Sequence, residues 1–161
     1  VVAELMDAGR LRITTEAAAA IPDAEVIITA TSTPLPIIES GLPRHGAIIC
    51  DVAQPPNVPS TILAERPDLL LFDGGIIAMP HGRGLGVRYG LPDGLTYACM
   101  AETMLLSLAG AFELVSVTEH LSDSAMSTLA RLAEEHGFTL AALQRWRSTH
   151  GDVIPAEGQV R

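Results

Sequence analysis

Three short apolar runs constrain the fold of this chain more than any other feature of its sequence. They occupy residues 25–30, 47–52 and 69–73 and consist mainly of Ile, Val, Leu and Ala. Each run is continuously apolar rather than alternating, which is typical of strands buried on both faces of a parallel sheet. A proline-rich segment at residues 33–39 separates the first two runs. Residues 59–66, which have room for one short helix, separate the second run from the third. The pattern predicts an α/β protein with a mainly parallel sheet and short crossovers.

The flanking segments predict further elements. Residues 1–8 are expected to end a helix at Gly9, residues 11–14 to form a short strand, and residues 16–20 a short alanine-rich helix. Beyond the third run, residues 97–109 have helical spacing and stop at Gly110. Ser122 begins a capping sequence for an amphipathic helix that ends at Gly137, and a last short helix is expected at 141–147.

Together these elements predict one domain over residues 1–161. We expect it to be the C-terminal part of a doubly wound, Rossmann-type domain, with residues 97–147 as its closing helices. The chain opens on Val1 rather than Met, and the glycine-rich βαβ part that would hold a cofactor's pyrophosphate is expected to be missing. The segment alone is therefore expected to bind NADPH poorly and to be inactive.

Composition narrows the range of partners. The net charge is −9 at pH 7, which gives nucleic acid no basic surface to bind. All ten basic residues are Arg, so no Lys is available for Schiff-base chemistry. No apolar run approaches the roughly 20 residues that cross a bilayer. Cys50 and Cys99 have neither disulfide nor metal-ligand spacing, so no metal is expected and a cytoplasmic location fits best.

Small and polar residues follow each apolar run. Because ligands of open α/β sheets bind outside the carboxyl ends of the strands, these positions are candidates for binding the NADPH or NADH cofactor. An alternative for each cluster is ordinary turn chemistry. The candidate cofactor-binding residues are Ala30, Thr31, Ser32, Asp51, Ala53, Gly74 and Gly75.

Three residues are candidates for catalysis. Cys99 lies in the first turn of the helix expected at 97–109, where unpaired amides and the helix dipole favour a thiolate nucleophile. The alternative is a buried structural cysteine. His81 opens a glycine-rich loop at 81–94, which also carries Arg83 and Arg88, and it could act as general acid or thiol partner, or be simply solvated. Glu102 follows Cys99 by three residues and could face the same side of the helix, or be an ordinary carboxylate near a helix start.

Several of these segments resemble a known enzyme group. Residues 25–32, 49–55, 73–75, 97–106 and 136–138 are similar to the long-chain fatty acyl-[acyl-carrier-protein] reductases that form aldehydes, and to the predicted amino-acid dehydrogenases of the shikimate dehydrogenase and glutamyl-tRNA reductase superfamily. The Ala98-Cys99-Met100-Ala101-Glu102 segment is the most specific of them. The resemblance implies that Cys99 takes the acyl group from a carrier thioester and that NADPH reduces it to an aldehyde.

Three functions remain open on the sequence. The first is reduction of an acyl thioester, delivered by acyl carrier protein, coenzyme A or another carrier, through Cys99. The second is a shikimate-type or amino-acid-type dehydrogenase that forms no covalent intermediate. The third is a non-catalytic module that binds a nucleotide. The sequence does not define the oligomeric state.

Overall fold

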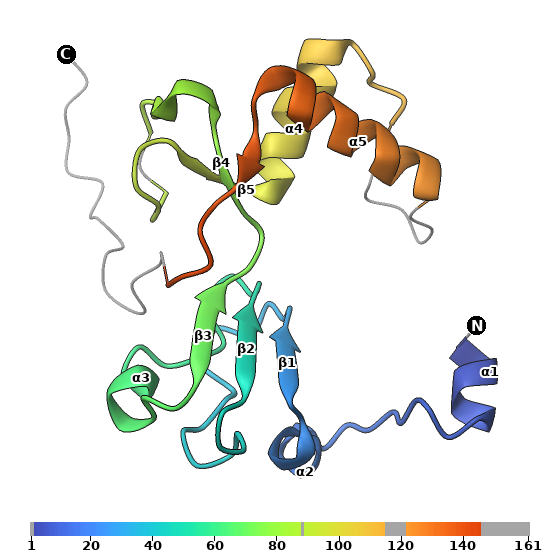
Figure 1. Cartoon of the computed structure of the whole chain (residues 1–161), viewed down its shortest axis with the longest axis vertical. Helices are drawn as coiled ribbons and strands as arrows, with labels where there is room; N and C mark the ends of the chain where they lie inside the picture. The colour runs from blue at the N-terminus through green and yellow to red at the C-terminus, as the bar shows by residue number, and fades with distance from the viewer. Residues whose placement is uncertain (1, 88, 115–121, 146–161) are drawn as a thin grey trace. The chain divides into compact units, whose positions relative to one another are not determined.

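The computed structural model describes residues 2–87, 89–114 and 122–145. The chain forms two compact units, residues 1–70 and 71–161, and each is described by itself. Strand β3 crosses the boundary between them. The fold is mixed α/β and compatible with part of a Rossmann-like domain, as the sequence predicts (Figure 1).

The first sheet is built from the three predicted strands. Its order is β1-β2-β3, and Figure 1 shows the three arrows pointing the same way. β1 and β2 pair in parallel from Val26 opposite Ile48 to Thr29 opposite Asp51. Two short helices precede β1, and α3 lies between β2 and β3. The elements are α1 (Val2–Asp7), α2 (Ala17–Ala20), the 3-10 turn η1 (Ile21–Asp23), β1 (Val26–Thr29), β2 (Ile48–Asp51), α3 (Ile62–Glu65) and β3 (Leu70–Asp73).

The burial of these strands corrects one expectation. Side chains alternate, so that Ile27 and Thr29 of β1 are buried while Val26 and Ile28 are 57% and 69% exposed. β2 and β3 follow the same alternation. One face of the sheet therefore carries the core, and the described residues leave the other face open, whereas the continuous apolar runs predicted burial on both.

Residues 11–14 also differ from expectation. They form no strand, although their side chains alternate in the sequence. Nearby, the Glu16 amide donates to Thr14 Oγ1, and α2 starts at Ala17 without a side-chain cap. Four alternating residues with no neighbouring strand to pair with do not make a β-strand, because a strand is stabilised by its ladder.

The second unit contains a small antiparallel sheet that the sequence did not predict. Its order is β5-β4-β6, with Ile76 opposite Tyr97, Ala78 opposite Leu95, and Ile77 opposite Leu140. Helices α4 and α5 follow in the chain, as predicted. The elements are β4 (Ile76–Ala78), the 3-10 turn η2 (Pro80–Gly82), β5 (Leu95–Tyr97), α4 (Ala98–Ala109), α5 (Asp123–His136) and β6 (Thr139–Leu140).

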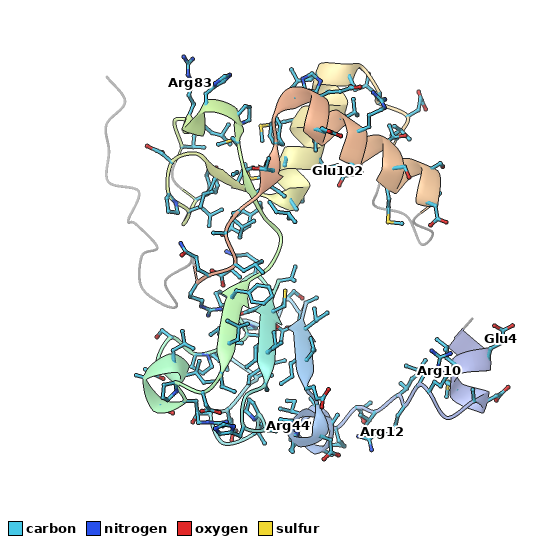
Figure 2. All side chains as sticks on the ribbon, in the orientation of Figure 1. Glu4, Arg10, Arg12, Arg44, Arg83 and Glu102 are labelled. Carbon is cyan, nitrogen blue, oxygen red and sulfur yellow. The ribbon has the colours of Figure 1, made fainter. Side chains whose placement is uncertain are left out.

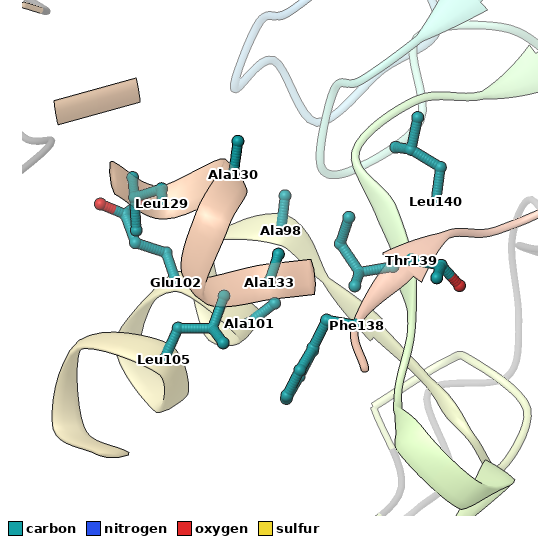
Figure 3. Close-up of a pocket in the computed structure, with 11 residues that line it drawn as sticks. Ala98, Ala101, Glu102, Leu105, Leu129, Ala130, Ala133, Phe138, Thr139 and Leu140 are labelled. Atoms are coloured by element: carbon teal, nitrogen blue, oxygen red, sulfur yellow. The ribbon is translucent and has the colours of Figure 1, made fainter. Parts of the chain in front are cut away.

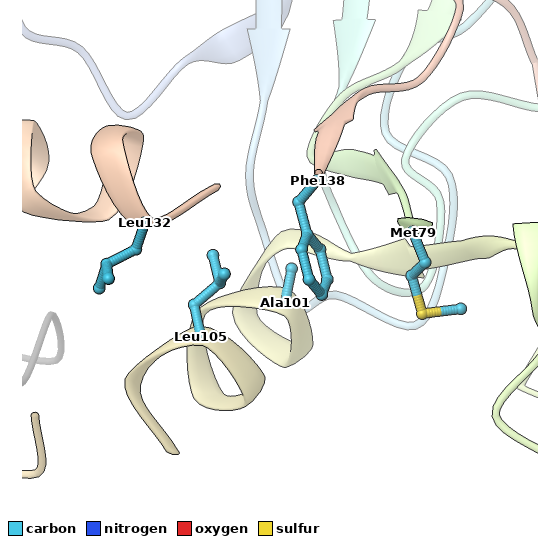
Figure 4. Packing of buried hydrophobic residues seen from close by; sticks show 5 residues of the cluster. All are labelled: Met79, Ala101, Leu105, Leu132 and Phe138. Atoms are coloured by element: carbon cyan, nitrogen blue, oxygen red, sulfur yellow. The ribbon is translucent and has the colours of Figure 1, made fainter. Parts of the chain in front are cut away.

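A hydrophobic cluster joins these helices to the small sheet. Ala101 and Leu105 of α4 pack with Leu132 of α5, with Met79 directly after β4 and with Phe138 directly before β6 (Figure 4). All five residues are buried. The cluster is the core of the second unit, and it forms because α4 and α5 each present apolar residues at helical spacing.

The ends of the two long helices follow local sequence signals. Gly110 ends α4 and Gly137 ends α5, with positive φ angles of 63° and 75° that glycine adopts at little cost. Ser122 Oγ caps α5 by accepting the Ala125 amide at 3.2 Å. These predictions are confirmed.

No helix in the described ranges is long and apolar enough to cross a membrane.

The last predicted helix is wrong over residues 141–145. There the Ala141 amide donates to the Ile76 carbonyl, and the Gln144 carbonyl accepts the Asp73 amide, both at 3.1 Å. These backbone bonds to β3 and to the start of β4 replace the helical bonds that residues 141–145 would otherwise make. The remainder of that prediction, Trp146 and Arg147, lies outside the described residues.

Candidate functional site

The carboxyl end of β2 is organised by Asp51. This side chain is fully buried, and its carboxylate accepts the Thr29 hydroxyl at 2.8 Å. It also accepts the backbone amides of Ala53, Asn57 and Val58 at 3.1 to 3.3 Å. Asp51 therefore fixes the loop after β2 against the end of β1, and its carboxylate is used inside the protein. Cofactor contact by Asp51 itself stays a prediction.

The loop after β1 is held in a similar way. Thr31 Oγ1 donates to Asn57 Oδ1 at 2.8 Å, and Asn57 is fully buried. Ala30, Thr31 and Ser32 are exposed, whereas Ala53 is buried. Of the predicted cofactor-binding residues in this unit, only the three that follow β1 thus offer accessible backbone and small side chains to a ligand.

In the second unit, the turn after β3 meets the start of α4. Gly75 adopts a φ of 68°, and its carbonyl accepts the Ala98 amide at 2.8 Å. Ala98 is the first residue of α4, and the N-cap residue Tyr97 provides no side-chain cap. The Gly74-Gly75 turn is therefore a backbone cap for the helix that carries the predicted nucleophile.

Cys99 is the second residue of α4 and is exposed. Its carbonyl accepts the Thr103 hydroxyl at 2.9 Å, a bond within the helix. Cys50 is half-buried in β2. The exposed position of Cys99 excludes the alternative of a buried structural cysteine and leaves the thiol accessible in the first turn of a helix, where an anion is favoured.

Glu102 lies one turn after Cys99. It is half-buried, and within the described part of the chain it makes no hydrogen bond or ion pair. Positions three apart on a helix are neighbours, so the thiol and the carboxylate share one side of α4. This pair is the part of the predicted catalytic set that the structure brings together.

His81 is placed elsewhere. The antiparallel register puts Tyr97, and hence Cys99, at the Ile76 end of β4, while His81 follows the Ala78 end. A ladder of three residue pairs is about 10 Å long. The structure therefore does not bring His81 to Cys99, which corrects the expectation of a thiol partner; the exposed His81 has a φ of 62°.

The glycine-rich loop folds back on its own base. A Cβ on Gly94, whose φ is 84°, would lie 2.9 Å from the Cα of Gly82, so glycine is required at this crossing. The Tyr89 hydroxyl donates to the Leu95 carbonyl at 2.6 Å. Arg83 is exposed on this loop (Figure 2), and Arg88 lies outside the described residues.

A pocket of about 410 Å³ lies in the second unit, next to Glu102 (Figure 3). Sequence reasoning missed it, because the residues at helical spacing on α4 were interpreted as core. The signal that could have indicated it is the row of small residues on the two helices. Its walls come from α4, α5, β4 and β6: Ile77, Ala98, Ala101, Glu102, Leu105, Leu129, Ala130, Ala133, Phe138, Thr139 and Leu140.

A buried ion pair was also not predicted. Arg145 Nη1 lies 2.9 Å from Asp73 Oδ1, and the Asp73 side chain is wholly buried while that of Arg145 is 15% exposed. The pair anchors the chain after β6 to the end of β3, directly before the Gly74-Gly75 turn.

No group of three or more potential metal ligands occurs among the described residues.

Comparison with known proteins gives a distant similarity over part of a longer protein. No family model matches the chain. The chain is 28% identical over 137 residues to a protein named Aminotransferase PigE from Serratia sp. (strain ATCC 39006). The match covers 83% of this chain but 16% of that protein, so the chain spans about one-sixth of the length of this curated relative. A distant relative is thus named as an enzyme.

Proposed function

We propose that this protein is an NAD(P)H-dependent oxidoreductase that reduces an acyl thioester to an aldehyde through a thioester on Cys99. The observation that carries the proposal is the exposed thiol at the start of α4, whose first amide is held by the turn that follows β3. An accessible thiol in a helix first turn is a favourable environment for a nucleophile. The sequence resemblance supplies the reaction class.

The first unit supports nucleotide binding. Its parallel sheet is compatible with a Rossmann-like fold, and the exposed, small residues Ala30, Thr31 and Ser32 at the carboxyl end of β1 fit a planar ring or a ribose. The hydrogen bond between Thr29 and Asp51 would position that loop. When bound, NADPH or NADH supplies a hydride.

The second unit supports acyl transfer. The Cys99 thiolate would attack the thioester carbonyl, forming a new carbon–sulfur bond as the carrier thiol leaves. Amide groups in the first turn of α4 would stabilise the oxyanion. Reduction of the enzyme thioester then releases an aldehyde and returns the Cys99 thiol. Glu102, on the same side of the helix, is the nearest candidate to hold a proton during the exchange.

The net charge of the chain bears on which acyl carrier it accepts, and the thiol bears on the cellular compartment. A net charge of −9 disfavours an acidic acyl carrier protein except at a local basic patch, and the exposed Arg83 is the described residue that could contribute to one. A coenzyme A ester is the alternative carrier. A nucleophilic thiol has to stay reduced, so we place the protein in the cytoplasm.

The name of the relative is compatible with this proposal. An aldehyde carbonyl is a group that an aminotransferase can convert to an amine. Many aminotransferases form a Schiff base between pyridoxal phosphate and a Lys of the enzyme. This chain could not supply that residue, because it contains no Lys.

Substitution of Cys99 tests the proposal. In the full-length protein, Cys99→Ala should abolish thioester reduction and the acyl adduct that intact-mass spectrometry detects on the wild type, while NADPH binding persists. Cys50→Ala is the matched control and should retain both, since Cys50 lies in β2. Turnover by Cys99→Ala would instead favour a shikimate-type or amino-acid-type dehydrogenase. NADPH binding without turnover of any thioester would favour a non-catalytic module.

A further inference from the structure

The pocket between α4 and α5 is lined mainly by apolar side chains. Two of its eleven lining residues, Glu102 and Thr139, have polar side chains, and these two lie toward opposite ends in Figure 3. Ala101, Leu105 and Phe138 belong to both the pocket wall and the buried cluster, so the floor is part of the core. A concave apolar site with few polar groups is typical of small-molecule binding.

We infer that this pocket binds an aliphatic chain whose head group is uncharged, and that Glu102 excludes the corresponding free carboxylate. The link to a thioester or aldehyde substrate rests on the function proposed above. The binding preference itself is a property of the pocket and is measured without turnover.

The width of the pocket is set by alanines. Ala98 and Ala101 of α4 and Ala130 and Ala133 of α5 all line the pocket (Figure 3). Larger side chains at these four positions would occupy part of the pocket volume, because all four line it. The alanines are therefore specificity-determining residues for the thickness of the chain that enters.

The charge preference comes from Glu102. This carboxylate lines the pocket and has no protein partner in the described part of the chain. A ligand carboxylate at the same end would place two negative charges close together in a partly desolvated site, which is unfavourable. A neutral carbonyl or hydroxyl head lacks this repulsion, and a hydroxyl can donate a hydrogen bond to Glu102.

Helical geometry places Cys99 at the same end. Ala98, Ala101, Glu102 and Leu105 recur at three- and four-residue spacing and form the face of α4 that lines the pocket. Cys99 does not line the pocket and lies about 60° around the helix beyond Glu102, which forms the edge of that face. A chain in the pocket would therefore have its head near both the carboxylate and the thiol, and Cys99 would receive the carbonyl of a neutral acyl group.

Two probes of equal length test the inference. Isothermal titration calorimetry with decanol and decanoate, below their aggregation limits and at a pH where decanoate is ionised, should show decanol binding at least about tenfold tighter. Glu102→Gln, which keeps the shape and removes the charge, should bring the two affinities close together by strengthening decanoate binding.

Substitutions in the wall and outside it locate the site. Ala130→Phe adds bulk at an exposed wall position and should weaken both probes about tenfold, and Ala133→Leu should do the same from the half-buried side. Ser127→Phe, exposed on the same helix but absent from the wall, is the matched control and should bind both probes normally. Circular dichroism verifies that each variant is folded.

The outcomes separate this inference from the proposed function. Equal affinity of the wild type for the two probes, or unchanged binding in both folded wall variants, would overturn the inference. Probe binding as expected, combined with full turnover by Cys99→Ala, would support the pocket and reject the covalent reaction. Loss of turnover in Cys99→Ala with no probe binding would support the reaction and reject the pocket.

Discussion

Arg66 connects three parts of the first unit through one guanidinium. Its Nε and Nη2 atoms donate to the two oxygens of Asp68, each at 2.8 Å, and Nη1 donates to the carbonyls of Ser40 and Pro43 at 2.8 and 3.0 Å. Asp68 also accepts the Gly46 amide at 3.1 Å. The planar fork of Arg suits this arrangement, and a Lys would not reproduce it. The pair therefore holds the loop before β2 against the turn before β3.

This arrangement predicts acid sensitivity. The hydrogen bond from Arg66, followed by that from the Gly46 amide, lowers the pKa of Asp68 from its ordinary value of 3.8. Because the folded-state pKa is the lower one, the stabilisation is fully present above the ordinary value and is lost as the pH falls through the folded value. Urea unfolding of the wild type should lose stability from about pH 5 downward, and Asp68→Asn should be less stable near neutrality with a weaker acid dependence. Asp7→Asn, at an exposed position, should match the wild type; equal acid dependence in all three proteins would contradict the prediction.

At the scale of single residues, the sequence predicted where a residue lies in its helix or strand better than which distant residues it contacts. The place of Cys99 in a helix first turn, one turn before Glu102, follows from spacing alone and is confirmed. The separation of His81 from Cys99 depends on the register of β4 and β5, which no local signal specifies. The Asp73 and Arg145 pair is 72 residues apart in the chain, and a scattered Arg gives no indication of a buried partner.

At the scale of elements, Asp51 holds the ends of β1 and β2 together. A conservative substitution at this position should therefore have a large effect on stability. Asp51→Asn removes the charge, replaces one acceptor with a donor, and leaves buried amides of the β2 loop poorly paired. We expect the free energy of unfolding to fall by about 3 kcal/mol. Thr29→Val removes only the hydroxyl donor at 2.8 Å and should cost about 1 kcal/mol. Chemical denaturation measures both, and a loss below that of Thr29→Val would show that Asp51 is not the organising residue.

Elements with strong local signals were predicted, and those that depend on distant pairing were not. The three apolar runs became β1, β2 and β3, and glycines at positions 110 and 137 mark the ends of α4 and α5. The strands of the second sheet are two or three residues long and flank glycine-rich sequence, so their periodicity is too short to recognise. They exist because β4 lies between β5 and β6, which come from different parts of the chain.

At the scale of the whole molecule, the two units have different organisation. Residues 1–70 contain β1, β2 and the first residue of β3, in a sheet built of neighbouring parallel strands. Residues 71–161 combine a small antiparallel sheet with two packed helices. The continuous apolar runs predicted the first arrangement, whereas the second requires contacts between β4 and β6, about 60 residues apart along the chain.

The chain that follows β6 is held at the end of β3, and Arg145 provides the buried contact. Arg145→Met keeps much of the side-chain volume but removes the guanidinium that lies 2.9 Å from the wholly buried Asp73 carboxylate. Removing one partner of a buried pair is costly, so the free energy of unfolding should fall by about 3 kcal/mol. Hydrogen exchange at the Asp73 amide, which donates to Gln144, should accelerate if the segment detaches. The double variant Asp73→Leu with Arg145→Met removes both charges and should recover part of the loss, because the carboxylate that lost the Arg145 guanidinium is removed as well. Additive effects of the two substitutions would show that the pair does not hold this segment in place.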